Sequence, residues 1–218
     1  MRMQLSYDQS FLEPVNCFQR EVMPMIDNVL VMKNVAAGKS IAVKTAISLG
    51  LIALAVLLPQ LVHLALGQPG GVKWLPMYLP ILIGGCLLGT RWALAVGILS
   101  PIVSFLLTSL GGNAMPAAPR LPFMILELAV FAAVSGLFTR KIVKNGLWAF
   151  PAVICAQIAG RLVFLAAIAL TQSFTSFTTG MIWGQIVTGI PGLVVQAILA
   201  PVIMIGLRAL LIADKENE

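Results

Sequence analysis

Residues 41–66 decide the fold class, and they read IAVKTAISLGLIALAVLLPQLVHLAL. Lys44, near the start, is the only charged residue in this run if the histidine is neutral. A helix needs about 20 consecutive apolar residues to cross the hydrocarbon core of a bilayer. The run is longer than that, so it predicts a transmembrane helix.

The rest of the chain has the same apolar character. Its 218 residues are 59% hydrophobic and 10% charged, and their mean hydropathy is +0.98. Because a soluble globular domain carries about 25% charged residues, this composition excludes a soluble enzyme, a secreted disulfide scaffold and a disordered chain. The apolar runs are continuous rather than alternating, which also argues against a β-barrel. An all-α integral membrane protein remains.

Further apolar runs follow the first one, and together they predict a bundle of six transmembrane helices, at residues 41–66, 75–89, 92–110, 121–138, 147–170 and 181–211. A single helix over residues 75–110 would place Arg91 in the middle of the bilayer, so we expect two helices there. Residues 41–211 are thus expected to form one membrane domain, flanked by tails at 1–40 and 212–218.

The basic residues predict how the bundle is oriented. Six spans place both termini on one side, and most of the 14 basic residues lie in the two tails and in the connections on that side. The opposite loops hold only Lys73 and Arg120. By the positive-inside rule both termini are cytoplasmic. The sequence pI of about 9.6 is therefore a topology signal rather than evidence for nucleic-acid binding.

The N-terminal tail differs in composition from the membrane domain, because charged residues interrupt it throughout. Apolar residues recur at helical spacing between Val22 and Met32, which is compatible with a short interfacial helix. An unstructured tail is the alternative.

The chain offers few residues that could act in catalysis or bind a metal ion. The cysteines Cys17, Cys86 and Cys155 are widely separated, and His63 is the only histidine. The chain has no HExxH, GxSxG or GxxxxGK[ST] motif. We therefore expect no enzyme, no metal site, no resident cofactor and no ATPase activity of its own.

Two charged residues lie inside predicted spans, Glu127 in the fourth and Arg161 in the fifth. A charge in the hydrocarbon core costs at least about 2.5–3.5 kcal/mol, so each is expected to have a partner or a function. They could pair and join the two helices, or one or both could face a substrate cavity. Gln157 lies one turn before Arg161 and would extend the same polar face.

Small residues recur at a spacing of four on the first span, at Ala42, Ala46 and Gly50. Such a face allows another helix to approach closely. The other helix could belong to the same bundle or to a partner protein. The outer loops at 67–74, 111–120 and 171–180 contain no acidic residue; they are either simple turns or the roof of a binding site.

Three segments carry a resemblance to a known family. They are WLPMYLPILIGGCLLGTRWALAVGILSPIVSFLLT at 74–108, LPFMILELAVFAAVSGLF at 121–138 and AGRLVFLAAIAL at 159–170. In this order they resemble the substrate-binding S components of energy-coupling factor (ECF) vitamin transporters, over roughly residues 41–211. The spacing of Pro76, Pro80, Leu82, Gly85 and Gly89 is the most specific part.

The resemblance implies a six-helix protein of the prokaryotic plasma membrane. Such a protein binds a water-soluble vitamin or cofactor precursor, of the pantothenate, folate or cobalamin type, on the outer side. It docks on a membrane coupling subunit that is served by two ATPase subunits.

The resemblance also implies roles for particular residues. The alanine face used for docking in the family corresponds to Ala42 and Ala46, with Gly50 continuing it. The substrate site corresponds to residues in the outer halves of the spans, namely Tyr78, Asn113, Glu127, Gln157, Arg161 and Trp183. A carboxylate ligand would suit Arg161, although Glu127 could already neutralise it; the residues leave the identity of the vitamin open.

Two other classes of protein remain as alternatives. In a self-sufficient secondary transporter or channel, Glu127 would be an intramembrane proton or ion site, but residues 41–110 and 121–211 show no convincing inverted repeat. A membrane enzyme or structural anchor is the third class, and the lack of catalytic motifs argues against the enzyme.

Overall fold

The computed structural model describes residues 37–112, 114–175 and 177–213. Six of the described helices are long and apolar enough to cross a membrane, at 41–67, 69–88, 90–110, 118–137, 146–171 and 179–207. The all-α bundle of six spans is thereby confirmed. The N-terminal tail before residue 37, with its possible interfacial helix, and the last residues of the C-terminal tail lie outside the described residues.

The long helices follow one another with short connections. They are α2 (Ala37–Trp74), α3 (Tyr78–Leu88), α4 (Thr90–Leu110), α5 (Leu121–Leu137), α7 (Ala149–Thr171) and α8 (Thr179–Ala213). Shorter elements connect some of them, namely the 3-10 helices η2 (Ala118–Arg120) and η3 (Gly146–Trp148) and the helix α6 (Thr139–Lys144).

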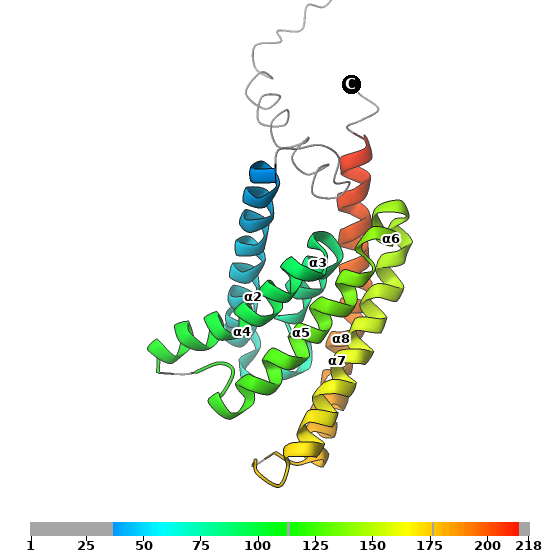
Figure 1. Cartoon of the computed structure of the whole chain (residues 1–218). Coiled ribbons are helices and arrows are strands. Elements are labelled where there is room, and N and C mark those ends of the chain that lie inside the picture. Colours follow the sequence, from blue (N-terminus) through cyan, green and yellow to red (C-terminus); the bar gives the residue numbers. More distant parts are fainter. Residues whose placement is uncertain (1–36, 113, 176, 214–218) are drawn as a thin grey trace, which may run out of the picture.

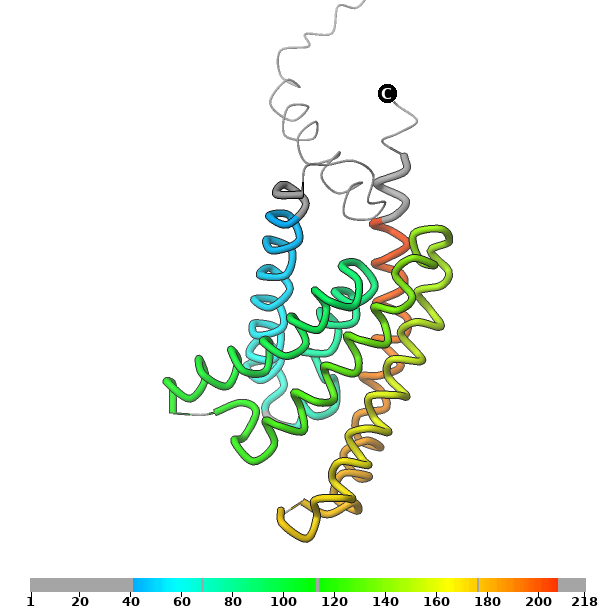
Figure 2. Tube along the Cα trace, in the orientation of Figure 1, coloured from blue at the N-terminus to red at the C-terminus, as the bar shows by residue number. Residues whose placement is uncertain are grey.

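The six spans are not parallel to one another. In Figure 1, α2 and α8 run along the length of the molecule, whereas α4 and α5 run obliquely across it. α5 packs against both α4 and α7, and α7 packs against α8. The tube in Figure 2 shows that the tip of the α4–α5 hairpin and the tip of the α7–α8 hairpin lie well apart at the lower end.

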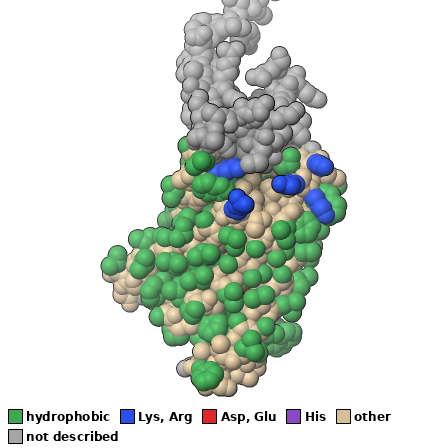
Figure 3. All heavy atoms as spheres, in the orientation of Figure 1, with side chains coloured by type: hydrophobic (Ala, Val, Ile, Leu, Met, Phe, Trp, Pro, Cys, Tyr) green, Lys and Arg blue, Asp and Glu red, His purple; other side chains and the backbone are tan. Residues whose placement is uncertain are grey.

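The basic side chains mark the opposite end of the bundle. The start of α2 and the end of α8 both lie at this end (Figure 1), and the visible Lys and Arg side chains gather there over an otherwise apolar surface (Figure 3). Arg91, Arg140 and Lys141 are all exposed. This is the distribution that the positive-inside rule predicts for a cytoplasmic face, and we call this end the cytoplasmic end.

The connection between the first two spans is largely helical, so the prediction of a loop over residues 67–74 was wrong. A kink at Gly67, whose φ is 68°, interrupts α2, and the helix then continues to Trp74. Gly67 reaches this conformation without the steric cost that a side chain would add. Pro69 comes directly after the kink, where a new helix tolerates proline because its first N–H groups need no intrahelical partner.

The next two spans are separate helices, as predicted for residues 75–110. Gly89 ends α3 with a φ of 79°, and α4 begins at the next residue. Glycines also bring the helices close together: a Cβ on Gly97 would lie 2.7 Å from the carbonyl oxygen of Leu128, and one on Gly136 would lie 2.7 Å from the backbone of Thr90. Small residues allow this close packing of α4 with α5.

The buried core lies where α3, α4, α5 and α7 meet. Its largest fully buried side chains include Ile81, Leu82, Val96, Leu128 and Phe131. This core holds α5 at the centre of the bundle, and α5 carries the one acidic residue among the six spans.

Candidate functional site

A charged pair lies in the interior of the bundle. Oε1 of Glu127, on α5, lies 3.0 Å from Nη1 of Arg161, on α7. The two side chains are 2% and 11% exposed, respectively. Glu127 and Arg161 therefore form a nearly buried ion pair that joins α5 to α7.

Tyr78 adds a third helix to this pair. Its hydroxyl donates a hydrogen bond of 2.7 Å to Oε2 of Glu127. Its ring stacks edge-on against Phe131 at 4.9 Å, and the guanidinium carbon of Arg161 lies 5.1 Å from the ring centroid. We refer to Tyr78, Glu127 and Arg161 as the polar cluster. It connects α3, α5 and α7.

The residues next to these side chains in the sequence allow them to contact one another. Gly160 directly precedes Arg161, and a Cβ at this position would lie 2.0 Å from Cε1 of Phe131. The glycine therefore lets α7 approach α5 closely enough for the ion pair to form. Tyr78 is the first residue of α3, so its side chain enters the bundle at the start of that helix.

The hydrogen-bonding capacity of the polar cluster is only partly used. Nε and Nη2 of Arg161 and Oε1 of Glu127 are buried and have no hydrogen-bond partner among the described residues. Gly189 of α8 lies beside this part of Arg161, since a Cβ on Gly189 would be 3.5 Å from Nη2. Because Oε1 of Glu127 faces Nη1 of Arg161 in the ion pair, the groups left for a further molecule are the Nε and Nη2 donors.

Gln157 lies one turn before Arg161 but has a different partner. Its side chain is buried, and Nε2 donates a hydrogen bond of 3.1 Å to the carbonyl oxygen of Leu193. The amide ties α7 to α8, so Gln157 borders the polar cluster without a direct bond to it.

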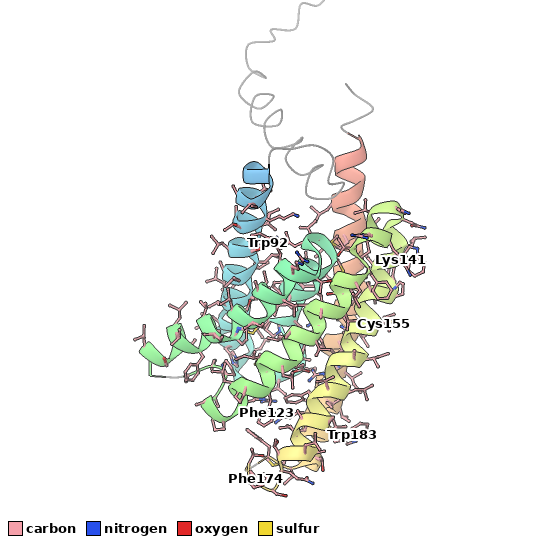
Figure 4. The ribbon with its side chains drawn as sticks, viewed as in Figure 1. Trp92, Phe123, Lys141, Cys155, Phe174 and Trp183 are labelled. Atoms are coloured by element: carbon pink, nitrogen blue, oxygen red, sulfur yellow. The ribbon has the colours of Figure 1, made fainter. Side chains whose placement is uncertain are left out.

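Trp183, also predicted for the substrate site, is not in the polar cluster. Trp183 is 60% exposed on α8, and Figure 4 shows it at the outer part of the α7–α8 hairpin. An exposed tryptophan near the end of a span is typical of the membrane–water interface. Asn113 lies outside the described residues.

Two glutamines of α8, which the sequence did not single out, make contacts across the bundle. Gln185 accepts a hydrogen bond from Nη2 of Arg120, at the start of α5. Buried Gln196 donates from Nε2 to the carbonyl oxygens of Trp74 and Leu75, at 2.9 and 2.8 Å. Their spacing of about three helical turns in an apolar run was the signal available in the sequence.

The small-residue face of α2 points away from the bundle. Ala42 and Ala46 are exposed, and a Cβ added to Gly50 would meet no heavy atom within 4 Å. Other residues of α2, such as Val43 and Ile52, make its buried side. The face therefore does not pack within the described part of the chain.

No group of three or more His, Cys, Asp or Glu residues that could hold a metal ion occurs among residues 37–213 where they are described. The charged groups of the site are those of the polar cluster itself.

Six apolar spans with an ion pair in their interior define a polytopic membrane protein. The chain belongs to the family of ECF transporter substrate-specific components, whose model matches residues 43–204. No curated protein and no solved structure matches the chain. Members of this family are transporter subunits rather than enzymes. The matched residues run from α2 to α8, which confirms the family resemblance seen in the sequence.

Proposed function

We propose that the protein is the S component of an ECF importer that takes up a water-soluble vitamin or cofactor precursor of the pantothenate, folate or cobalamin type. It binds this compound from the outside of a prokaryotic plasma membrane. It then passes the compound inward while docked on a membrane coupling subunit that two ATPase subunits drive. The observation that carries the proposal is the family match over residues 43–204.

The position of the polar cluster supports binding from outside. At a rise of about 1.5 Å per residue, Glu127 lies about 9 Å from the outer end of α5. Arg161 lies about 15 Å from the outer end of α7 by the same measure. A polar compound that enters between these outer helix ends would meet unused hydrogen-bonding groups within the outer half of the bundle.

The small-residue face of α2 supports docking on a partner. Ala42, Ala46 and Gly50 lie in the cytoplasmic half of α2. A coupling subunit that ATPases drive from the cytoplasmic side could contact this half of the helix. Small exposed side chains let a partner helix approach closely without polar groups.

The surroundings of Glu127 argue against its use as a proton or ion site in a self-sufficient transporter. Its carboxylate already forms an ion pair with Arg161 and accepts a hydrogen bond from the hydroxyl of Tyr78. These contacts favour a structural or ligand-binding role for Glu127.

Reconstituted uptake tests the proposal. Liposomes that contain the protein with an ECF coupling subunit and its ATPases should accumulate a radiolabelled vitamin from a panel when ATP is enclosed. Liposomes that contain the protein alone should not, even with a proton gradient. Uptake by the protein alone, driven by the gradient, would contradict the proposal and favour the self-sufficient transporter.

A further inference from the structure

Arg161 presents a complete unpaired edge of its guanidinium group. Nη1 faces Glu127, whereas Nε and Nη2 are buried without a hydrogen-bond partner among the described residues. The N–H of Nε and one N–H of Nη2 point in the same direction along one side of the planar group. This is the pair of donors that binds two acceptor oxygens at once.

Such an arrangement is costly unless an acceptor joins it. A buried donor without a partner costs about 1–3 kcal/mol, and more when the group is charged. Tyr78 covers a face of the guanidinium, and its hydroxyl donates a hydrogen bond to Glu127. The unpaired edge therefore points to a ligand that supplies two oxygens.

The backbone beside the edge is free of a side chain. Gly189 is buried next to Nη2, and a Cβ there would lie 3.5 Å from that nitrogen and 2.9 Å from Cδ1 of Leu75. The glycine therefore adds no α8 side chain over the edge, and its near neighbours are Leu75 and the carbonyl oxygen of Val72.

The charges of the outer half also favour an anion. Glu127 is the only Asp or Glu between residues 28 and 213, whereas the outer half also carries Lys73, Arg120 and Arg161. The ion pair neutralises one of these three positive charges and leaves the others. A ligand with one negative charge would balance the region better than a neutral one.

We infer that the transported compound carries a carboxylate that binds in bidentate fashion to Nε and Nη2 of Arg161. This inference rests on the proposed function. A carboxylate has two coplanar oxygens that match the edge and brings a single charge. A doubly charged phosphate ester would need more donors than one edge supplies, because Glu127 already offsets part of the charge on Arg161.

Mass spectrometry of the compounds that co-purify with the full chain tests the inference. Wild type, Arg161→Lys, Gly189→Ala and the control Arg91→Lys are purified from the same cells, and their small molecules are released by denaturation. Arg161→Lys keeps the charge opposite Glu127 but lacks the planar edge. Gly189→Ala keeps Arg161 and adds a methyl group beside the edge, and Arg91 is exposed at the cytoplasmic end.

We expect wild type and Arg91→Lys to release the same carboxylate compound. Arg161→Lys should release at least tenfold less, and Gly189→Ala several-fold less. The primary amide of that compound should bind wild type at least tenfold more weakly by calorimetry. If Arg161→Lys does not fold, the amount of compound released by Gly189→Ala and the affinity of wild type for the amide decide whether the inference holds.

Three results would overturn the inference. They are a retained compound without a carboxylate, equal retention by wild type and the folded variants, and equal affinity for the acid and its amide. If wild type and Arg91→Lys release no compound at all, the proposed function fails, and the inference fails with it.

Discussion

The polar cluster in the outer half of the bundle and the small-residue face on the cytoplasmic half of α2 are built in opposite ways. In the cluster, Glu127 is buried and contacts two other helices through Tyr78 and Arg161. On the face, Ala42 and Ala46 are exposed. The polar cluster is formed by contacts within the chain, whereas the small-residue face is exposed.

The difference shows what joins helices in a membrane. Lipid is as apolar as the side chains of the spans, so apolar burial alone gives little drive for helices to associate. Polar pairs and close glycine contacts are therefore the places where this chain holds itself together. A close-packing face that lacks a partner in the chain is then available to another protein.

The largest expected effect on folding comes from removing the charge of Glu127. In Glu127→Ala, Arg161 keeps its charge in the interior without a counter-charge, and such a loss destabilises a protein by about 3–5 kcal/mol. Unfolding in detergent, followed by circular dichroism, measures the change in stability.

Arg91→Gln serves as the control for this experiment, because Arg91 is exposed at the cytoplasmic end. Its stability should stay within about 0.5 kcal/mol of wild type. If Glu127→Ala were as stable as Arg91→Gln, the ion pair would not hold α5 to α7.

A smaller loss is expected when the contact between α5 and α7 is overfilled. A Cβ in Gly160→Ala would lie 2.0 Å from Cε1 of Phe131, so the Phe131 ring or the helices must shift, at a cost toward the upper end of the about 1–3 kcal/mol that is typical of overpacking. The matched control is Gly50→Ala, where the added Cβ meets no heavy atom within 4 Å. Thermal unfolding of both variants should show a loss for Gly160→Ala alone, and equal values would refute the close contact.

Tyr78→Phe should have a smaller effect again. The variant keeps the ring against Phe131 and removes only the hydrogen bond to Oε2 of Glu127. A hydrogen bond to a charged group contributes about 1.5–2 kcal/mol. The same unfolding experiment measures it, and a stability equal to that of wild type would mean that the ring, rather than the hydroxyl, carries the contribution of Tyr78.

The number and class of the spans could be predicted from the sequence because they depend on local composition. The separation of α3 from α4 followed from Arg91, which a single long helix would have placed in the hydrocarbon core. The helical continuation of α2 beyond Gly67 could not be predicted in the same way. Glycine and proline in GQPGGVKW suit a loop as well as a kink between two helices, and packing against α8 decides between them.

The charged residues of the candidate site could be predicted from local composition, whereas Tyr78 was expected only from the family resemblance. Glu127 and Arg161 stand out because a charge is rare and costly in a span, and the structure pairs them. Which atoms of Arg161 remain unpaired depends on the rotation of its side chain and on α3. The contacts of Gln185 and Gln196 depend on how α8 packs against distant segments, which local composition does not reveal.

The smallest expected effect on folding, and the most direct test of the whole account, comes from the double variant Ala42→Leu with Ala46→Leu. Because both positions are exposed, its stability should stay within about 0.5 kcal/mol of wild type. Binding of the co-purifying compound should also be unchanged. ATP-dependent uptake in liposomes with the coupling subunit and ATPases should fall at least tenfold, because the larger side chains keep the partner helix away.

Ala95→Leu, at another exposed alanine in the cytoplasmic half of α4, is the matched control and should transport normally. Normal uptake by the Ala42→Leu, Ala46→Leu double variant would contradict the account, as would loss of binding together with uptake. The first result would mean that the face of α2 is not used for docking, and the second that it supports the fold or the ligand site.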